Sequence, residues 1–230
     1  MNRFLSLFRK KKQHEMDMTT GSIAGNLLAF ALPLLVGNLF QQLYNMVDTW
    51  VIGQTGQNAA YAAVGSVGPI INVMIGIFSG LASGAGVVIS RAFGAKDREG
   101  VKHAVHTAML ITAAFSVAFT VLGVLLTPLS LRLMLGSDTS EIFAHAKTYL
   151  TIYFAGIAGL LFYNMGSGIL RAVGDSRHPF YYLLVSAISN IILDLLFVFV
   201  FHMGVSGVAL ATVIAQLLSA ILDSARFLYR

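Results

Sequence analysis

Two acidic residues, Asp48 and Asp194, each interrupt a long apolar stretch of the sequence. Asp48 is the only charged residue between Asp17 and Arg91, and Asp194 is the only Asp, Glu, Lys or Arg between Arg177 and Asp223. If these stretches cross a membrane, an ionised carboxylate at the bilayer centre costs about 2.5–3.5 kcal/mol even on the most lenient scale. Each acid then needs a solvating cavity, a partner or a proton, and is a candidate functional residue.

Both acids belong to polar stripes. One stripe consists of Asn38, Gln41, Gln42, Asn45, Asp48 and Thr49, and the other of Ser186, Ser189, Asn190 and Asp194. At about 100° per residue in a helix, the first stripe covers an arc of roughly 120°, and the second is slightly wider. Polar stripes on otherwise apolar helices cannot face lipid, so we expect them to face each other or a water-filled cavity.

The spacing of Asn190 and Asp194 suggests the chemistry. One helical turn separates them, which sets an amide oxygen beside a carboxylate. Such a site can hold a proton between oxygens or coordinate a small hard cation. We therefore predict that Asp48, Asn190 and Asp194 exchange H⁺ or Na⁺. The alternative is that the stripes only join helices through hydrogen bonds.

Composition indicates the elements that position these residues. The chain is 57% hydrophobic and 11% charged, against roughly 25% charged in soluble domains. We predict an all-α membrane protein, with a basic tail over 1–22 and a six-transmembrane-helix bundle over 23–230. The six spans are expected near 26–52, 59–86, 104–127, 145–170, 180–201 and 207–226, since a span needs about 20 mostly apolar residues.

Basic residues give the orientation. If the N-terminus is inside, the inside segments hold 13 of the 15 Lys and Arg residues, and the outside segments hold only Arg132 and Lys147. Under the positive-inside rule, both termini are therefore expected in the cytoplasm and the six spans in the plasma membrane.

The remaining sequence patterns indicate less about function. Gly76, Gly80 and Gly84 form two overlapping GxxxG steps, which predict close helix packing. There is no GxxxxGK[ST] phosphate loop and no H-E-x-x-H or G-x-S-x-G signature. We therefore expect a carrier that is not an enzyme and has no cofactor beyond its coupling ion.

Five motifs resemble the multidrug and toxic compound extrusion (MATE) family of transporters. They are LPLLVGNLFQQLYNMVDTWVIGQTG (32–56), ISRAFGAKDRE (89–99), ILRAVGDSRHPF (169–180), NIILDLLFVF (190–199) and GVSGVALATVIAQ (204–216). The resemblance covers nearly the whole chain beyond the basic tail. Family members have twelve helices in two six-helix lobes, and this sequence resembles the N-terminal lobe only.

The resemblance implies antiport, in which amphipathic or cationic organic compounds leave the cell as H⁺ or Na⁺ enters. It implies that Asp48, Asp194 and Asn190 form the cation site of this lobe. The candidates for the substrate cavity are Gln41, Asn45, Asn164 and Thr212. The fifth-span motif usually reads Asp-Pro, whereas Leu195 follows Asp194 here, so a weaker bend is expected. Function is expected to need a second six-helix lobe, from the same or a separate chain, and no nucleic acid.

Three alternatives remain open. A lipid-precursor flippase of the same superfamily would share the lobe, but a more cationic cavity would favour it. An intramembrane aspartyl protease also uses two membrane-embedded acids, but its Tyr-Asp and Gly-x-Gly-Asp motifs do not surround Asp48 or Asp194. The chain could also be a half-transporter fragment that is inactive alone.

The orientation can be tested by labelling single cysteines, because the chain has none of its own. We expect a cysteine at Thr55 to react with a membrane-impermeant maleimide added to intact cells. A cysteine at Gly94 is expected to react only after the membrane is permeabilised. Labelling of position 94 in intact cells would contradict the orientation.

Overall fold

The computed structural model describes residues 22–136 and 140–228, which form helices joined by short connections. The helices are α2 (Ile23–Gly53), α3 (Asn58–Gly94), α4 (Arg98–Leu135), α5 (Glu141–Ala155), α6 (Ile157–Ala172), α7 (Arg177–Leu195), the π-helical turn η1 (Leu196–Val200) and α8 (Gly204–Leu228). The tail predicted over 1–22 lies outside the described residues, apart from Ser22, which caps α2 by accepting from the Gly25 N–H.

The lengths and composition of these helices suit a membrane. Within the described part of the chain, five helices are long and apolar enough to span one, and the bent pair of α5 and α6 supplies a sixth span. The predicted all-α, six-helix membrane bundle is thus confirmed. Helices α3 and α4 have 37 and 38 residues, or about 55 Å at 1.5 Å per residue, which exceeds the roughly 30 Å hydrocarbon core.

Helix α4 extends beyond the predicted third span. That span was expected to stop at Thr127–Pro128, but the helix continues through Pro128 to Leu135. It ends at Gly136, whose φ of +69° is left-handed and suits a residue without a side chain. At the other end Asp97 accepts from the Gly100 N–H at 2.9 Å. The cap residues Asp97 and Gly136 determine where the helix begins and ends, and Pro128 does not end it.

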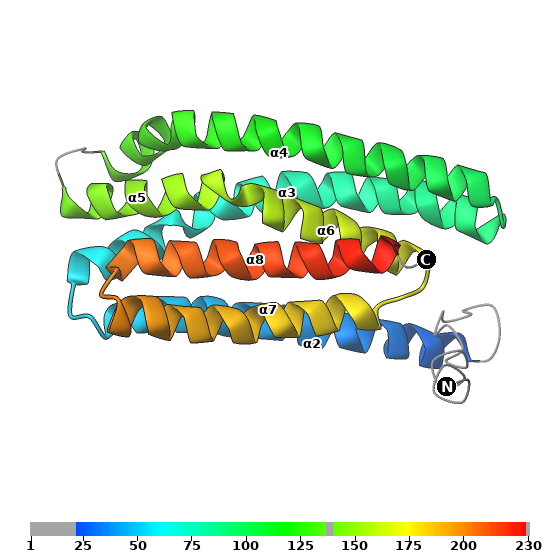
Figure 1. Cartoon of the computed structure of the whole chain (residues 1–230), viewed down its shortest axis with the longest axis horizontal. Coiled ribbons are helices and arrows are strands. Elements are labelled where there is room, and N and C mark those ends of the chain that lie inside the picture. The colour runs from blue at the N-terminus through cyan, green and yellow to red at the C-terminus, as the bar shows by residue number, and fades with distance from the viewer. Residues whose placement is uncertain (1–21, 137–139, 229–230) are drawn as a thin grey trace, which may run out of the picture.

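Helix α8 is the element around which the other spans are arranged. It packs against α5, α6 and α7, while α2 packs on α7, and α3 contacts α4, α5 and α6. Figure 1 shows the helices running roughly parallel to one long axis, with the start of α2 and the end of α8 at the same end of the bundle. Helix α8 is also well buried, with 61% of its most apolar window inside the lobe.

The span predicted over 145–170 is not one continuous helix. Helices α5 and α6 meet at Gly156 with a bend of 51°. Helix α8 lies against this bend, since a Cβ on Gly156 would clash with Cγ1 of Val213. The absence of a side chain at Gly156 lets the two helices approach at the bend.

The predicted packing role of the GxxxG steps is wrong for this structure. A Cβ added to Gly76, Gly80 or Gly84 would meet no atom within 4 Å. The close contacts are made instead by glycines of the α5–α6 region, such as Gly159, whose added Cβ would lie 2.8 Å from the backbone nitrogen of Leu217. Spacing alone did not distinguish a packed glycine face from a bare one.

The Gly156 contact predicts a specific loss of stability. We expect Gly156→Ala to lower the free energy of unfolding by about 1–3 kcal/mol through overpacking, measured by thermal unfolding in detergent. Val213→Ala should restore part of this loss because it removes the clashing methyl groups. Gly76→Ala is the control and should be neutral or slightly stabilising, since helix propensity favours alanine by about 1 kcal/mol. Equal losses at positions 76 and 156 would contradict this account.

Candidate functional site

The structure brings together the two predicted acids. Asp48 lies near the end of α2 and Asp194 near the end of α7, and these helices pack against each other. Asp194 and Asn190 lie beside the Asp48 carboxylate. All three side chains are buried, with exposed fractions of 4% for Asp48, 0% for Asp194 and 1% for Asn190.

A third helix supplies a hydroxyl to this cluster. Thr212 of α8 is also buried, and its Oγ1 donates to Oδ2 of Asp48 at 3.3 Å. The same hydroxyl lies 3.0 Å from the carbonyl oxygen of Val208, one turn earlier. Asp48, Asn190, Asp194 and Thr212 are called the carboxylate cluster below.

Most oxygen atoms of the carboxylate cluster lack partners. Oδ1 of Asp48, both carboxylate oxygens of Asp194 and the amide oxygen of Asn190 have no hydrogen-bond partner. Two carboxylates side by side in a low-dielectric interior repel each other strongly if both are ionised. A shared proton or a bound monovalent cation would relieve that repulsion and satisfy the orphaned oxygens.

The cluster suits a proton or a small hard cation better than a transition metal. Its donors are carboxylate, amide and hydroxyl oxygens, which alkali and alkaline-earth cations prefer. Among the described residues no group of three or more His, Cys, Asp or Glu side chains could hold a metal ion. Asp48, Asn190 and Asp194 are therefore the residues that could hold Na⁺.

Asp48 also faces a cavity of about 280 Å³. Gln41, Asn45 and Thr212, which were predicted to line a cavity, line this one together with Asp48. Asn190 and Asp194 adjoin Asp48 but are not part of the cavity lining. The fourth predicted residue, Asn164, lines a separate smaller cavity, and its Nδ2 donates to the Leu160 carbonyl oxygen at 2.8 Å.

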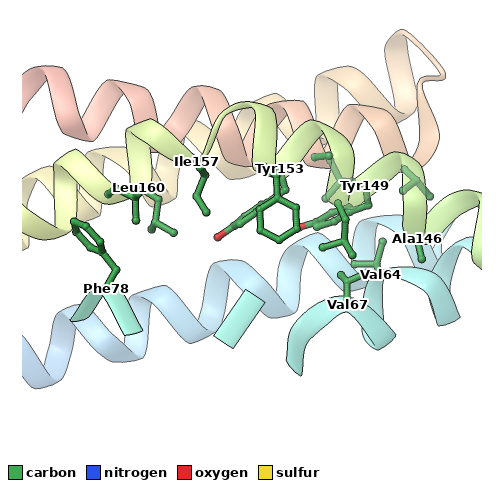
Figure 2. Close-up of a cluster of buried hydrophobic side chains, with 14 of the residues drawn as sticks. Val64, Val67, Phe78, Ala146, Tyr149, Tyr153, Ile157 and Leu160 are labelled. Carbon is green, nitrogen blue, oxygen red and sulfur yellow. The ribbon is translucent and has the colours of Figure 1, made fainter. Parts of the chain in front are cut away.

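Aromatic residues of α5 form another wall of the larger cavity. Tyr149 and Tyr153 line it and are buried, with stacked rings whose centroids are 6.2 Å apart. Figure 2 shows them extending from α5 toward α3, near Val64 and Val67. Neither was predicted from the sequence, although their spacing of four residues places them on one helix face.

Gln216 of α8 is another missed member of the lining. It lies one turn after Thr212 and is buried, and its Oε1 has no hydrogen-bond partner. A spacing of four between two polar residues in an apolar span could have identified it, as it identified Asn190 and Asp194. Among the described residues, the lining contains one acid and no Lys or Arg.

The helix that carries Asp194 changes its geometry just beyond it. Helix α7 ends at Leu195, and η1 continues the chain over Leu196–Val200 as a π-helical turn. The Phe201 N–H donates to the Leu196 carbonyl oxygen at 3.0 Å, closing this wider turn. Thus the backbone departs from α-helical geometry here although Leu195 stands where the family has proline. Such π-helical turns are frequent at functional sites.

Comparison with known proteins agrees with the resemblance seen in the motifs. The MatE family model matches residues 33–196. The probable multidrug resistance protein YpnP of Bacillus subtilis is 30% identical over 200 residues, which cover 87% of this chain and 44% of the relative. YoeA, a probable multidrug resistance protein of the same organism, is 34% identical over 85% of this chain and 43% of its own length.

A solved structure has the same fold. The inward-facing conformation of a multidrug resistance MATE family transporter of the MOP superfamily is 30% identical, with a TM-score of 0.73 over 81% of this chain and 42% of the other. The chain thus spans less than half the length of the relatives it matches.

The hydroxyl of Thr212 gives a test of the carboxylate cluster. We expect Thr212→Val to lower the free energy of unfolding by about 1–3 kcal/mol, because it removes the hydrogen-bond donor of a buried acid. Thr212→Ser should be near neutral, because it keeps the hydroxyl. Thr112→Val is the matched control, since the buried Thr112 hydroxyl bonds only the Ala108 carbonyl of its own helix. Thermal unfolding in detergent measures all three, and equal losses for both Thr→Val variants would count against the cluster.

Proposed function

The chain belongs to the MatE family, and on that premise we propose that it forms one lobe of an ion-coupled exporter of small amphipathic or cationic organic compounds. The exchange is H⁺ or Na⁺ inward for substrate outward. The observation that carries the proposal is the carboxylate cluster, in which four buried oxygen atoms lack partners beside a cavity lined by polar and aromatic side chains.

The substrate class follows from the lining of the cavity. Tyr149 and Tyr153 offer aromatic surface, Asp48 offers negative charge, and the lining has no Lys or Arg. Aromatic faces attract organic cations, whereas an anionic lipid precursor would meet only a like charge. This favours multidrug export over the flippase alternative, and both YpnP and YoeA are named as probable multidrug resistance proteins.

A second lobe completes the proposed site. A cavity of about 280 Å³ falls just below the roughly 300–1,000 Å³ of sites that hold drug-sized ligands. Asn38, Gln42 and Asn45 on α2 are exposed on this lobe, and amide side chains are disfavoured against lipid. We infer that another six-helix lobe, from the same or a separate chain, covers this polar stripe.

The coupling mechanism rests on the cost of unpaired buried charge. Without an ion, the carboxylate cluster holds buried oxygens that no protein donor satisfies. A bound ion relieves the repulsion between Asp48 and Asp194. If the two conformations of the transporter differ in how well they enclose the cluster, the ion binds one better and shifts the equilibrium. The substrate can bind the aromatic wall in either state, so the ion gradient sets the direction.

Orientation is part of the proposal. The distribution of 13 basic residues against 2 supports a plasma-membrane protein with both termini in the cytoplasm. The carboxylate cluster would then lie in the outer half of the lobe, because Asp48 and Asp194 are near the far ends of α2 and α7. An ion entering from outside would then reach the carboxylate cluster before it reaches the cytoplasmic half of the lobe.

The proposal predicts the loss of transport in two conservative variants. In the assembled transporter, Asp48→Asn and Asp194→Asn should each reduce efflux driven by an imposed pH or Na⁺ gradient to background, with expression near normal, because asparagine keeps the shape but not the ionisable group. The measurement is substrate efflux from reconstituted vesicles.

The control is Asp97→Asn, which alters an acid at the start of α4 far from the cluster and keeps a good helix cap. It should pump at the parental rate. If both cluster variants also pump at that rate, the two acids are structural and the coupling proposal is wrong.

A further inference from the structure

Helix α8 carries a polar stripe that leads away from the carboxylate cluster. Its members are Thr212, Gln216, Ser219 and Asp223, at spacings of four, three and four residues. At 100° per residue they fall within an arc of about 60° and extend for about 16 Å. All four are buried, so the stripe runs inside the lobe from the cluster to the end of the bundle where α8 finishes.

The stripe ends at a further buried acid, Asp223, which is only 1% exposed. Its Oδ2 accepts a hydrogen bond from Ser167 Oγ of α6 at 3.0 Å. Its Oδ1 has no partner. The backbone of α6 lies against it, since a Cβ on Gly166 would be 3.0 Å from Oδ2. The aspartate is therefore enclosed with one oxygen satisfied and one not.

The charged and titratable groups around Asp223 are few. Arg171 and Asp175 act on it electrostatically, as does the Tyr163 hydroxyl group. Asp175 is paired with His178, whose Nδ1 is 2.7 Å from Oδ2 of Asp175. Arg171 is exposed and does not form an ion pair with Asp223 among the described contacts, so the carboxylate is not locked in a salt bridge.

A small cavity lies beside Ser167, the residue that donates to Asp223. It has a volume of about 90 Å³ and is lined by Asn38, Gln41, Asn164, Ser167 and Arg171, among others. That volume accommodates more than one water molecule, since one needs roughly 10–15 Å³ of such space, and the lining offers several polar partners. Gln41 also lines the larger cavity with Asp48. Gln41 therefore borders both cavities.

We propose that Asp223 is a second proton-accepting site, which receives the proton from the Asp48–Asp194 pair and releases it at the end of the bundle that holds the start of α2 and the end of α8. In the transfer, an O–H bond on the pair breaks, water in the two cavities carries the proton past Gln41, and an O–H bond forms on Asp223. Release to solvent beside Arg171 returns the carboxylate. This relay rests on the proposed antiport and requires H⁺ as the coupling ion.

A structural role for Asp223 makes different predictions. If Asp223 only holds α6 to α8, its function is to accept the Ser167 hydrogen bond, and asparagine can do this as well. Asp223→Asn therefore separates the two roles, because it keeps the acceptor and removes the exchangeable proton. Asp223→Glu keeps the proton but lengthens the side chain, and Ser167→Ala removes the hydrogen bond while keeping the acid.

The first experiment needs no transport. Infrared spectra of the purified full chain, recorded across a pH series, report protonated carboxylic acids. We expect Asp223→Asn to remove one titrating component from the parental signal, and Asp97→Asn to leave the buried-acid components unchanged. An unchanged carboxylic-acid signal in Asp223→Asn would show that Asp223 does not exchange protons and would overturn the proposal.

The second experiment measures efflux from vesicles that contain the assembled transporter under a pH gradient. Asp223→Asn should slow efflux by roughly tenfold or more, consistent with the loss of a positioned proton carrier, while substrate binding stays at the parental level. Ser167→Ala should retain most of the rate, and Asp223→Glu should restore more of it than asparagine does.

Parental efflux in Asp223→Asn, with Asp194→Asn inactive, would overturn the relay and leave the proposed antiport intact. Efflux driven by a Na⁺ gradient alone would also overturn the relay and leave the proposed antiport intact. Parental efflux in Asp48→Asn and Asp194→Asn would instead remove the antiport premise and the relay with it.

Discussion

Polar atoms buried in a membrane protein must find partners within the protein, because the hydrocarbon offers none. This lobe meets that requirement in most places by local means. The hydroxyls of Thr112, Ser116 and Thr127 each donate to the carbonyl one turn earlier in α4. Ser186 reaches across to the Ala215 carbonyl at 2.8 Å and joins α7 to α8. Against this background, the oxygens left without partners are concentrated at the carboxylate cluster and along α8. An ion or a proton bound at these positions would provide the partner that these oxygens lack.

Close packing against glycines explains why α8 is central. Three glycines at the bend between α5 and α6 and along α6 face it: Gly156 meets Val213, Gly159 meets Leu217 and Gly166 meets Asp223. This close contact holds α6 and α8 as one unit, and that unit carries Thr212, Ser167 and Asp223. Gly76, Gly80 and Gly84 of α3, by contrast, have open space around them. The polar face of α2 and the bare face of α3 are thus two surfaces of the lobe that can meet another element.

The sequence was sufficient for features that depend on the period of one helix. Asp48, Asn190 and Asp194 could be identified because polar residues at helical spacing are conspicuous in an apolar span, and the all-α membrane class follows from the same contrast.

Features that depend on contact between helices could not be predicted from the sequence. The bend at Gly156 requires knowledge that Val213 lies opposite, and the GxxxG steps on α3 looked like a contact because nothing in the spacing shows which face is covered. Tyr149 and Tyr153 looked like ordinary apolar content until α3 was placed beside them. Asp223 was overlooked because it lies near the end of its span, where an acid would usually reach water.

The length of the α3–α4 hairpin has a practical consequence for imaging. These two helices are about 55 Å long, and Figure 1 shows their connected end extending past the end of α8. The connection, Ala95 to Asp97, is short and is anchored by hydrogen bonds from Ala95, Lys96 and Asp97 to carbonyls of α3. A helical scaffold fused in frame through this connection would continue both helices without a flexible joint. The hairpin thereby offers a rigid fiducial for electron cryomicroscopy, which a 24.7 kDa chain embedded in a micelle otherwise lacks.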